Sequence, residues 1–155
     1  MKTFVRNSLA VLAGLFLGSL VNMALVEVGP KLIPLPAGAN VSTMEGLAKS
    51  IPLFSPANFL FPFLAHALGT LVAAFVAARF AASQPMKLAL AIGVLFLAGG
   101  ISAVYMLGGP LWFSACDLLF AYIPMSYLGG RLAARPAAGS AGVTPIRTAT
   151  HIPPQ

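Results

Sequence analysis

The chain has 155 residues, of which 59% are hydrophobic and only 8% are charged, and its formal net charge is +6. A soluble domain carries about a quarter charged residues, so this composition argues against a soluble protein and for a membrane protein. The basic residues flank apolar stretches and form no continuous patch, which argues against nucleic acid as a partner. The single cysteine, Cys116, excludes an intrachain disulfide and lies in an apolar stretch, where we expect it to be a small buried packing residue.

The first apolar stretch, residues 8–28, follows a short basic head that contains Lys2 and Arg6. A cleaved signal peptide would have the same order, but its apolar region is roughly 7–15 residues long, shorter than this run. We therefore interpret the run as a first membrane span. Gly14 and Gly18 match the GxxxG spacing and are predicted to contact another helix, in this chain or in a second copy.

Residues 29–55 form the only substantial loop, and we predict that it lies outside the cell. A short amphipathic helix is expected at about 43–51, because Ser42 and Glu45 have the spacing of a capping box. Its apolar side would lie on the membrane surface or across the mouth of the helices.

The second span, residues 57–82, has one small, partly polar face and one bulky apolar face. On a helical wheel His66 falls on the small face, together with a small-xxx-small row of Gly69, Ala73 and Ala77. Small residues allow close helix contact in a membrane, so this face should point into the protein. Pro62 lacks a backbone N–H and predicts a kink.

The third and fourth spans are predicted at 86–107 and 111–130, with a kink near Pro124 in the fourth. The fold class is therefore all-α, an integral membrane bundle of four spans that forms a single domain over residues 1–135. Residues 136–155 are rich in Ala, Gly, Thr and Pro and are expected to form a disordered cytoplasmic tail.

The distribution of basic residues predicts the orientation. An even number of spans places both termini on one side, with Lys2, Arg6, Arg79, Lys87, Arg131, Arg135 and Arg147, and leaves Lys31 and Lys49 on the other. Positive charge collects on the cytoplasmic side of membrane proteins. We therefore expect a multi-pass protein of a bacterial-type plasma membrane with both termini in the cytoplasm.

Polar residues of all four spans fall at a similar depth and predict a polar layer in the outer half of the protein. At 1.5 Å per residue, Asn22 lies about 9 Å, His66 about 13 Å and Asp117 about 10 Å from the outer end of its span. Each ionisable residue at this depth calls for a partner or water. The candidate layer is Asn22, His66, Thr70, Ser102, Tyr105, Ser114 and Asp117, with Asp117 accepting hydrogen bonds from His66, Asn22 and Ser102.

Three functions fit this layer. A dry hydrogen-bonded layer would suit a structural or accessory protein, which would form a homo-oligomer or join another membrane protein. A cavity open to the outside would suit a proton- or ion-linked binder or transporter of a small solute that uses His66 and Asp117. An enzyme is the weakest candidate, because no catalytic motif is present and one His with one carboxylate is a poor metal signature. We assign no catalytic residue, metal or cofactor from the sequence, and the lipid bilayer is the expected partner.

Overall fold

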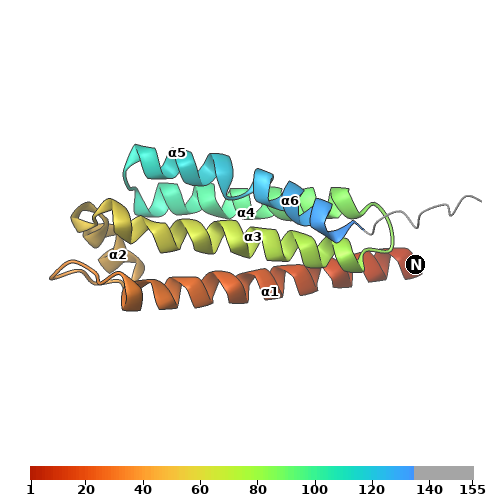
Figure 1. Cartoon of the computed structure of the whole chain (residues 1–155), viewed down its shortest axis with the longest axis horizontal. Coiled ribbons are helices and arrows are strands. Elements are labelled where there is room, and N and C mark those ends of the chain that lie inside the picture. Colours follow the sequence, from red (N-terminus) through yellow and green to blue (C-terminus); the bar gives the residue numbers. More distant parts are fainter. Residues whose placement is uncertain (135–155) are drawn as a thin grey trace, which may run out of the picture.

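The computed structural model describes residues 1–134, in which every regular element is a helix and no β-strand occurs. Four segments are long and apolar enough to cross a membrane: Lys2–Leu32, Pro56–Phe80, Pro85–Leu107 and Leu111–Ala133. They run side by side along the long axis of the molecule (Figure 1). The expected tail, with Arg135 and Arg147, lies outside the described residues.

Helices α1 (Lys2–Leu32) and α3 (Leu60–Phe80) make the most extensive contact in the molecule. A Cβ atom added at Gly14 would lie 2.5 Å from the carbonyl oxygen of Ala73, and one added at Gly18 would lie 2.5 Å from that of Gly69. The glycines of α1 therefore pack directly on the Gly69, Ala73 and Ala77 row of α3. The GxxxG surface of α1 is therefore covered by α3 of the same chain.

At the end of the molecule that carries the N-terminus, polar contacts tie α1 to the connection between α3 and α4 (Pro85–Leu107). The Asn7 carbonyl oxygen accepts from the backbone N–H of Ala82 at 2.8 Å, and the Asn7 amide donates to Ser83 Oγ at 3.1 Å. Arg6 Nε donates to the carbonyl oxygen of Phe80 at 3.1 Å. These bonds explain why α1 begins at Lys2, earlier than its apolar run.

The fourth span is interrupted, as predicted near Pro124. It consists of α5 (Leu111–Phe120) and α6 (Ile123–Ala133), with Ala121 and Tyr122 between them. Pro124 has no N–H to give to the preceding turn, so a continuous helix would lose a hydrogen bond there. At the start of α6 the same proline is tolerated, because the first N–H groups of a helix are unpaired in any case.

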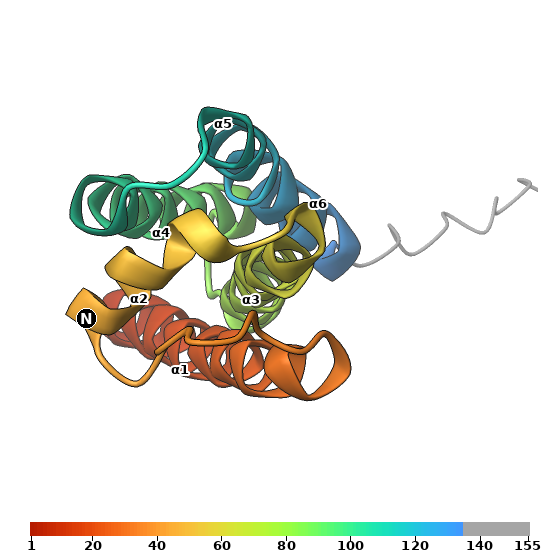
Figure 2. The same ribbon diagram turned by 90° about the vertical axis from the view of Figure 1, so that its left-hand side faces the viewer.

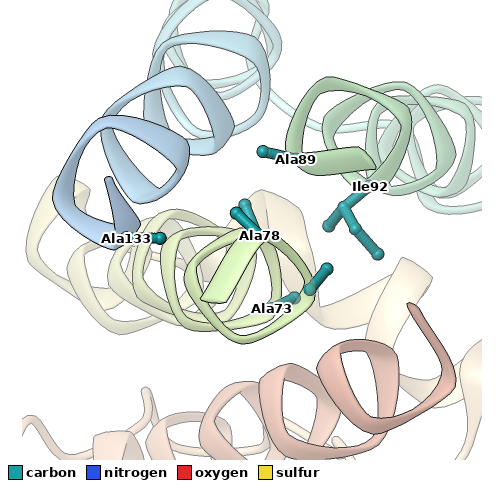
Figure 3. Packing of buried hydrophobic residues seen from close by; sticks show 7 residues of the cluster. Ala73, Ala78, Ala89, Ile92 and Ala133 are labelled. Carbon is teal, nitrogen blue, oxygen red and sulfur yellow. The ribbon is translucent and has the colours of Figure 1, made fainter. Parts of the chain in front are cut away.

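The core of the molecule consists mainly of alanine. Figure 3 shows Ala73 and Ala78 of α3 packed near Ala89 and Ile92 of α4, with Ala133 of α6 beside them. Large apolar side chains such as Phe16, Leu95 and Leu119 are exposed instead. This inverted pattern suits a lipid solvent, in which bulky apolar side chains lose nothing by facing outward and small ones let helices approach.

Residues 33–59 cover one end of the helices, which we call the loop end. Figure 2 looks onto this end and shows α2 (Met44–Ser50) lying across it between α1 and α4. The predicted cap of α2 is off by one residue. Thr43 is the N-cap and its hydroxyl accepts from the N–H of Gly46 at 3.0 Å, whereas Ser42 donates to Asn40 Oδ1 at 2.7 Å.

Two short 3₁₀ helices, η1 (Ile51–Leu53) and η2 (Pro56–Phe59), connect α2 to α3. Ser55 and Asn58 cap η2 reciprocally, and the Asn58 amide also donates to the carbonyl oxygen of Pro34 at 3.1 Å. Because η2 precedes α3, Pro62 lies in the first turn of α3. The kink predicted at Pro62 is thus replaced by a change of helix type before it.

Candidate functional site

Asp117 of α5 is the centre of a buried polar cluster. His66 Nδ1 lies 2.9 Å from both carboxylate oxygens, and the Tyr122 hydroxyl donates to Oδ2 at 2.8 Å. The Asp117 side chain is only 4% exposed, whereas that of His66 is 28% exposed. We call these three residues the Asp117 cluster.

The break in the fourth span brings Tyr122 to Asp117. In a continuous helix, residues five apart point about 140° away from each other at 100° per residue. Here Tyr122 has φ −113° and ψ −76°, between α5 and α6, and its ring turns back to the carboxylate. Gly100 of α4 leaves the space for this ring, because a Cβ atom there would collide with the Tyr122 hydroxyl.

The contacts of His66 fix its orientation. Its ring stacks on that of Tyr122, with centroids 5.7 Å apart and an interplanar angle of 29°. In the tautomer that carries its proton on Nδ1, this nitrogen donates to the carboxylate of Asp117. Nε2 is then the ring nitrogen that is left for another molecule. It accepts a hydrogen bond in the neutral imidazole and donates one in the imidazolium.

A cavity of about 280 Å³ extends from the loop end to the Asp117 cluster. His66, Gly100 and Asp117 are the deepest of its lining residues along their helices. Most of the others are apolar, and they come from all four long segments and from the loop; examples are Ile33, Leu47, Ile51, Phe54, Phe61 and Val104.

A second cavity, of about 340 Å³, meets the same histidine from the side. Its walls come from α1, α3 and α4, with Tyr122 at the break of the fourth span. Both cavities are lined by His66, Gly100 and Ala103. The imidazole therefore lies where the two spaces meet.

Three other predicted residues of the polar layer lie near the cluster or the cavities. Thr70 is buried and donates to the backbone oxygen of His66 at 2.7 Å. Ser114 is buried and lines the first cavity. Asn22 lines the second cavity, where its Cβ lies 3.1 Å from the position that a side chain at Gly69 would take.

Two predicted residues of the layer point elsewhere. Ser102 is exposed and donates to the carbonyl oxygen of Ala98 in its own helix, at 2.9 Å, so the expected bond to Asp117 is not formed. Tyr105 is 87% exposed. Gly100 marks the buried face of α4, and at 100° per residue Ser102 and Tyr105 lie about 160° and 140° away from it. They have the predicted depth but lie on the wrong side of the helix.

The donors to Asp117 within residues 1–134 are thus His66 and Tyr122, and the expected bond from Asn22 is also not formed. Tyr122 was not among the residues predicted for the polar layer. The signal for it was the proline two residues later, since a helix that breaks at that point frees the preceding aromatic residue to turn inward.

The described part of the chain contains no group of three or more His, Cys, Asp or Glu side chains placed to hold a metal ion. Cys116 neighbours Asp117 but is exposed, so the expected buried packing role for it is wrong. No protein-family model, no curated protein and no solved structure matches the chain. The residues of the site are therefore the only basis for a functional proposal.

Proposed function

We propose that the chain is an integral protein of a bacterial-type plasma membrane, with its N-terminal end in the cytoplasm and its loop end outside. Four helical segments of sufficient length and hydropathy support this proposal. The charges of residues 1–134 support the orientation. Five basic residues belong to the N-terminal end, namely Lys2, Arg6, Arg79, Lys87 and Arg131, and two, Lys31 and Lys49, belong to the loop end. Such a bias is typical of cytoplasmic ends.

Single cysteines placed at Thr3 and at Ser42, in a Cys116→Ala background, test the orientation. Both positions are exposed, one at each end of the molecule. In intact cells, a membrane-impermeant thiol reagent should label position 42 and leave position 3 unlabelled until the membrane is opened. Labelling of position 3 alone would show that the orientation is opposite to the one proposed. Equal labelling of both positions would contradict insertion across the membrane.

Within this protein, we propose that a small molecule binds beside His66, with the Asp117 cluster as the polar element that recognises it. The observation that carries the proposal is the cavity of about 280 Å³ that ends on His66 and Asp117. Binding sites for small molecules are mostly apolar concavities with a few convergent polar groups. The walls and the deep end of this cavity have that composition.

Proton-linked binding follows from the chemistry of the histidine. Histidine is the side chain that ordinarily changes charge near neutral pH. Gain of a proton at Nε2 would turn this atom from an acceptor into a donor, so it would change which ligand groups fit. Asp117 would hold the ring in place in both states through Nδ1.

A structural or accessory role is the second candidate, and one observation favours it. Asp117 accepts from both of its neighbours, and residues 1–134 contain no buried side-chain nitrogen or oxygen without a hydrogen-bond partner. A fully satisfied network of this kind fixes how helices pack without requiring a ligand. The two candidates differ in whether Nε2 can be reached by a small molecule.

Modification of His66 by diethyl pyrocarbonate measures that access. The chain has two histidines, so a His151→Ala variant leaves His66 as the single target. In folded protein in lipid nanodiscs, mass spectrometry of the His66 peptide should show modification at a rate within about tenfold of that in denatured protein. Ala103→Leu, which adds bulk where the two cavities meet, should slow the reaction, whereas Ala98→Leu on the exposed face of α4 should not.

Modification of His66 only after denaturation would show a sealed layer and would favour the structural role. An equal rate in the Ala103→Leu variant and its Ala98→Leu control would show that the reagent does not pass through the cavities, which contradicts the binding proposal.

A further inference from the structure

The second cavity lies on the side of the molecule, between α1 and α4. Both helices pack on α3, but they contact each other only weakly. Figure 2 shows α1 and α4 apart from each other, with α2 lying across the space between them at the loop end. The cavity there is lined by exposed residues of both helices: Ser19 and Met23 of α1, and Gly99 of α4. A Cβ atom added at Gly99 would have no heavy atom of another part of the chain within 4 Å, so this part of the wall is open.

The loop end is closed by comparison. Leu47, Ile51 and Phe54 of the loop line the first cavity on that side. Hydrogen bonds hold this cover in place: Asn58 to the carbonyl oxygen of Pro34 at 3.1 Å, and the N–H of Asn40 to Ser50 Oγ at 2.8 Å. A molecule that enters from the loop end passes this cover, whereas one that enters between α1 and α4 does not.

The charges around the two cavities restrict what can bind. Their lining residues include no lysine or arginine, so nothing permanently positive is present to receive an anion. The carboxylate of Asp117 is 4% exposed and already accepts from two side chains, so it is poorly placed to receive a cation. A buried charge without a partner costs several kcal/mol, so a neutral ligand is favoured.

The polar groups that remain suit a hydroxyl group. Nε2 of neutral His66 can accept from an O–H, and the Asn22 amide, which lines the same lateral cavity, can donate to its oxygen. The apolar cavity beyond His66 can hold the rest of the molecule. At about 30 Å³ for each water in the liquid, 280 Å³ corresponds to roughly nine waters or an organic molecule of similar size.

We infer that the molecule bound beside His66 is a neutral, hydroxyl-bearing apolar compound that is dissolved in the bilayer and enters between α1 and α4. This inference rests on the proposed binding function and adds to it the class of ligand and the route.

The test uses n-octanol and its isomer methyl heptyl ether, which has the same atoms but no donor. Full-length protein with His151→Ala, in nanodiscs, gives the imidazole signals of His66 alone by nitrogen-15 NMR. Titration with n-octanol should shift the Nε2 signal to saturation. The ether and octanoate should need at least about ten times the membrane concentration for the same shift. Gly99→Leu should slow the exchange of n-octanol at the site about tenfold, as measured from the line shape of the Nε2 signal, and its neighbour Ala98→Leu should leave the exchange rate unchanged.

Each outcome tests a different part of the inference: the chemical class of the ligand, its route of entry, or the proposed binding function. Equal shifts with the ether or octanoate would overturn the hydroxyl class. A normal exchange rate in Gly99→Leu would overturn lateral entry while leaving the site intact. Failure of all three probes to shift the signal overturns the ligand class. If His66 is then also unreactive towards diethyl pyrocarbonate in the folded protein, the proposed function fails with it.

Discussion

Replacement of His66 by alanine should destabilise the protein by about 3–5 kcal/mol, because it leaves the buried carboxylate of Asp117 without its histidine partner. Asp117→Asn should cost less, because it removes the charge and keeps an oxygen for Nδ1. The double variant His66→Ala/Asp117→Asn should recover part of the loss of the single His66 variant, since coupled sites are not additive.

The measurement is unfolding in detergent of the wild type, both single variants and the double variant. The size of the coupling distinguishes two kinds of contact. Hydrogen bonds between membrane helices average about 0.6 kcal/mol, so a coupling well above about 1 kcal/mol would indicate an ion pair. Ser102→Ala is the matched control. Ser102 has a depth similar to that of the cluster but is exposed, so its loss should stay within about 0.5 kcal/mol. Strictly additive losses would contradict the pairing.

The second large effect is expected at the contact between α1 and α3. Leucine at Gly18 would place its Cβ 2.5 Å from the Gly69 oxygen and 2.6 Å from Ala73 Cβ, so the helices must move apart. Gly14→Leu meets the Ala73 oxygen in the same way. Overpacking of a core usually costs about 1–3 kcal/mol, and the backbone obstacle here places each variant at or above the upper end.

Ala13→Leu serves as the control for these variants, because Ala13 is next to Gly14 in the sequence but lies on the exposed face of α1. Unfolding and detergent-solution mass are measured together. A loss of stability at unchanged mass is the expected result for a contact within one chain. A change in mass without a loss of stability would instead assign the two glycines to an interface between copies.

The sequence predicted the elements of the fold well, because membrane spans depend on length and hydropathy, which are local properties. The third and fourth spans begin within one residue of their predicted starts. Pro124 correctly indicated the break between α5 and α6. The first span was predicted too short, because the helix begins at Lys2 and the predicted span begins at residue 8. Side chains at its polar N-terminal end bond to the α3–α4 connection, which no local pattern shows.

The site was harder to predict, because the depth of a residue along its helix does not determine the direction in which its side chain points. Counting residues from the end of a span gives depth, and it placed His66 and Asp117 at a similar level, where their side chains meet. The same count included Ser102 and Tyr105, which point away. Their direction depends on which face of α4 packs, and this is decided by Gly93 and Gly100 against α6 and Tyr122. Tyr122 itself reaches Asp117 only because the helix is broken.

That break divides the fourth span into two bodies with different attachments. α6 is held firmly: a side chain at Gly129 would strike the backbone of Leu71 and Phe75, and one at Gly130 would meet Ala89 and Met86. α5 has few contacts with α3, α4 or α6. Its polar attachment is the carboxylate of Asp117, with one bond to His66 and one across the break to Tyr122, while Trp112 and Phe113 pack on Phe59. α5 is thus a separate half-helix that is joined to α6 at residues 121–122, and the hydrogen bonds of the Asp117 cluster keep it against α3.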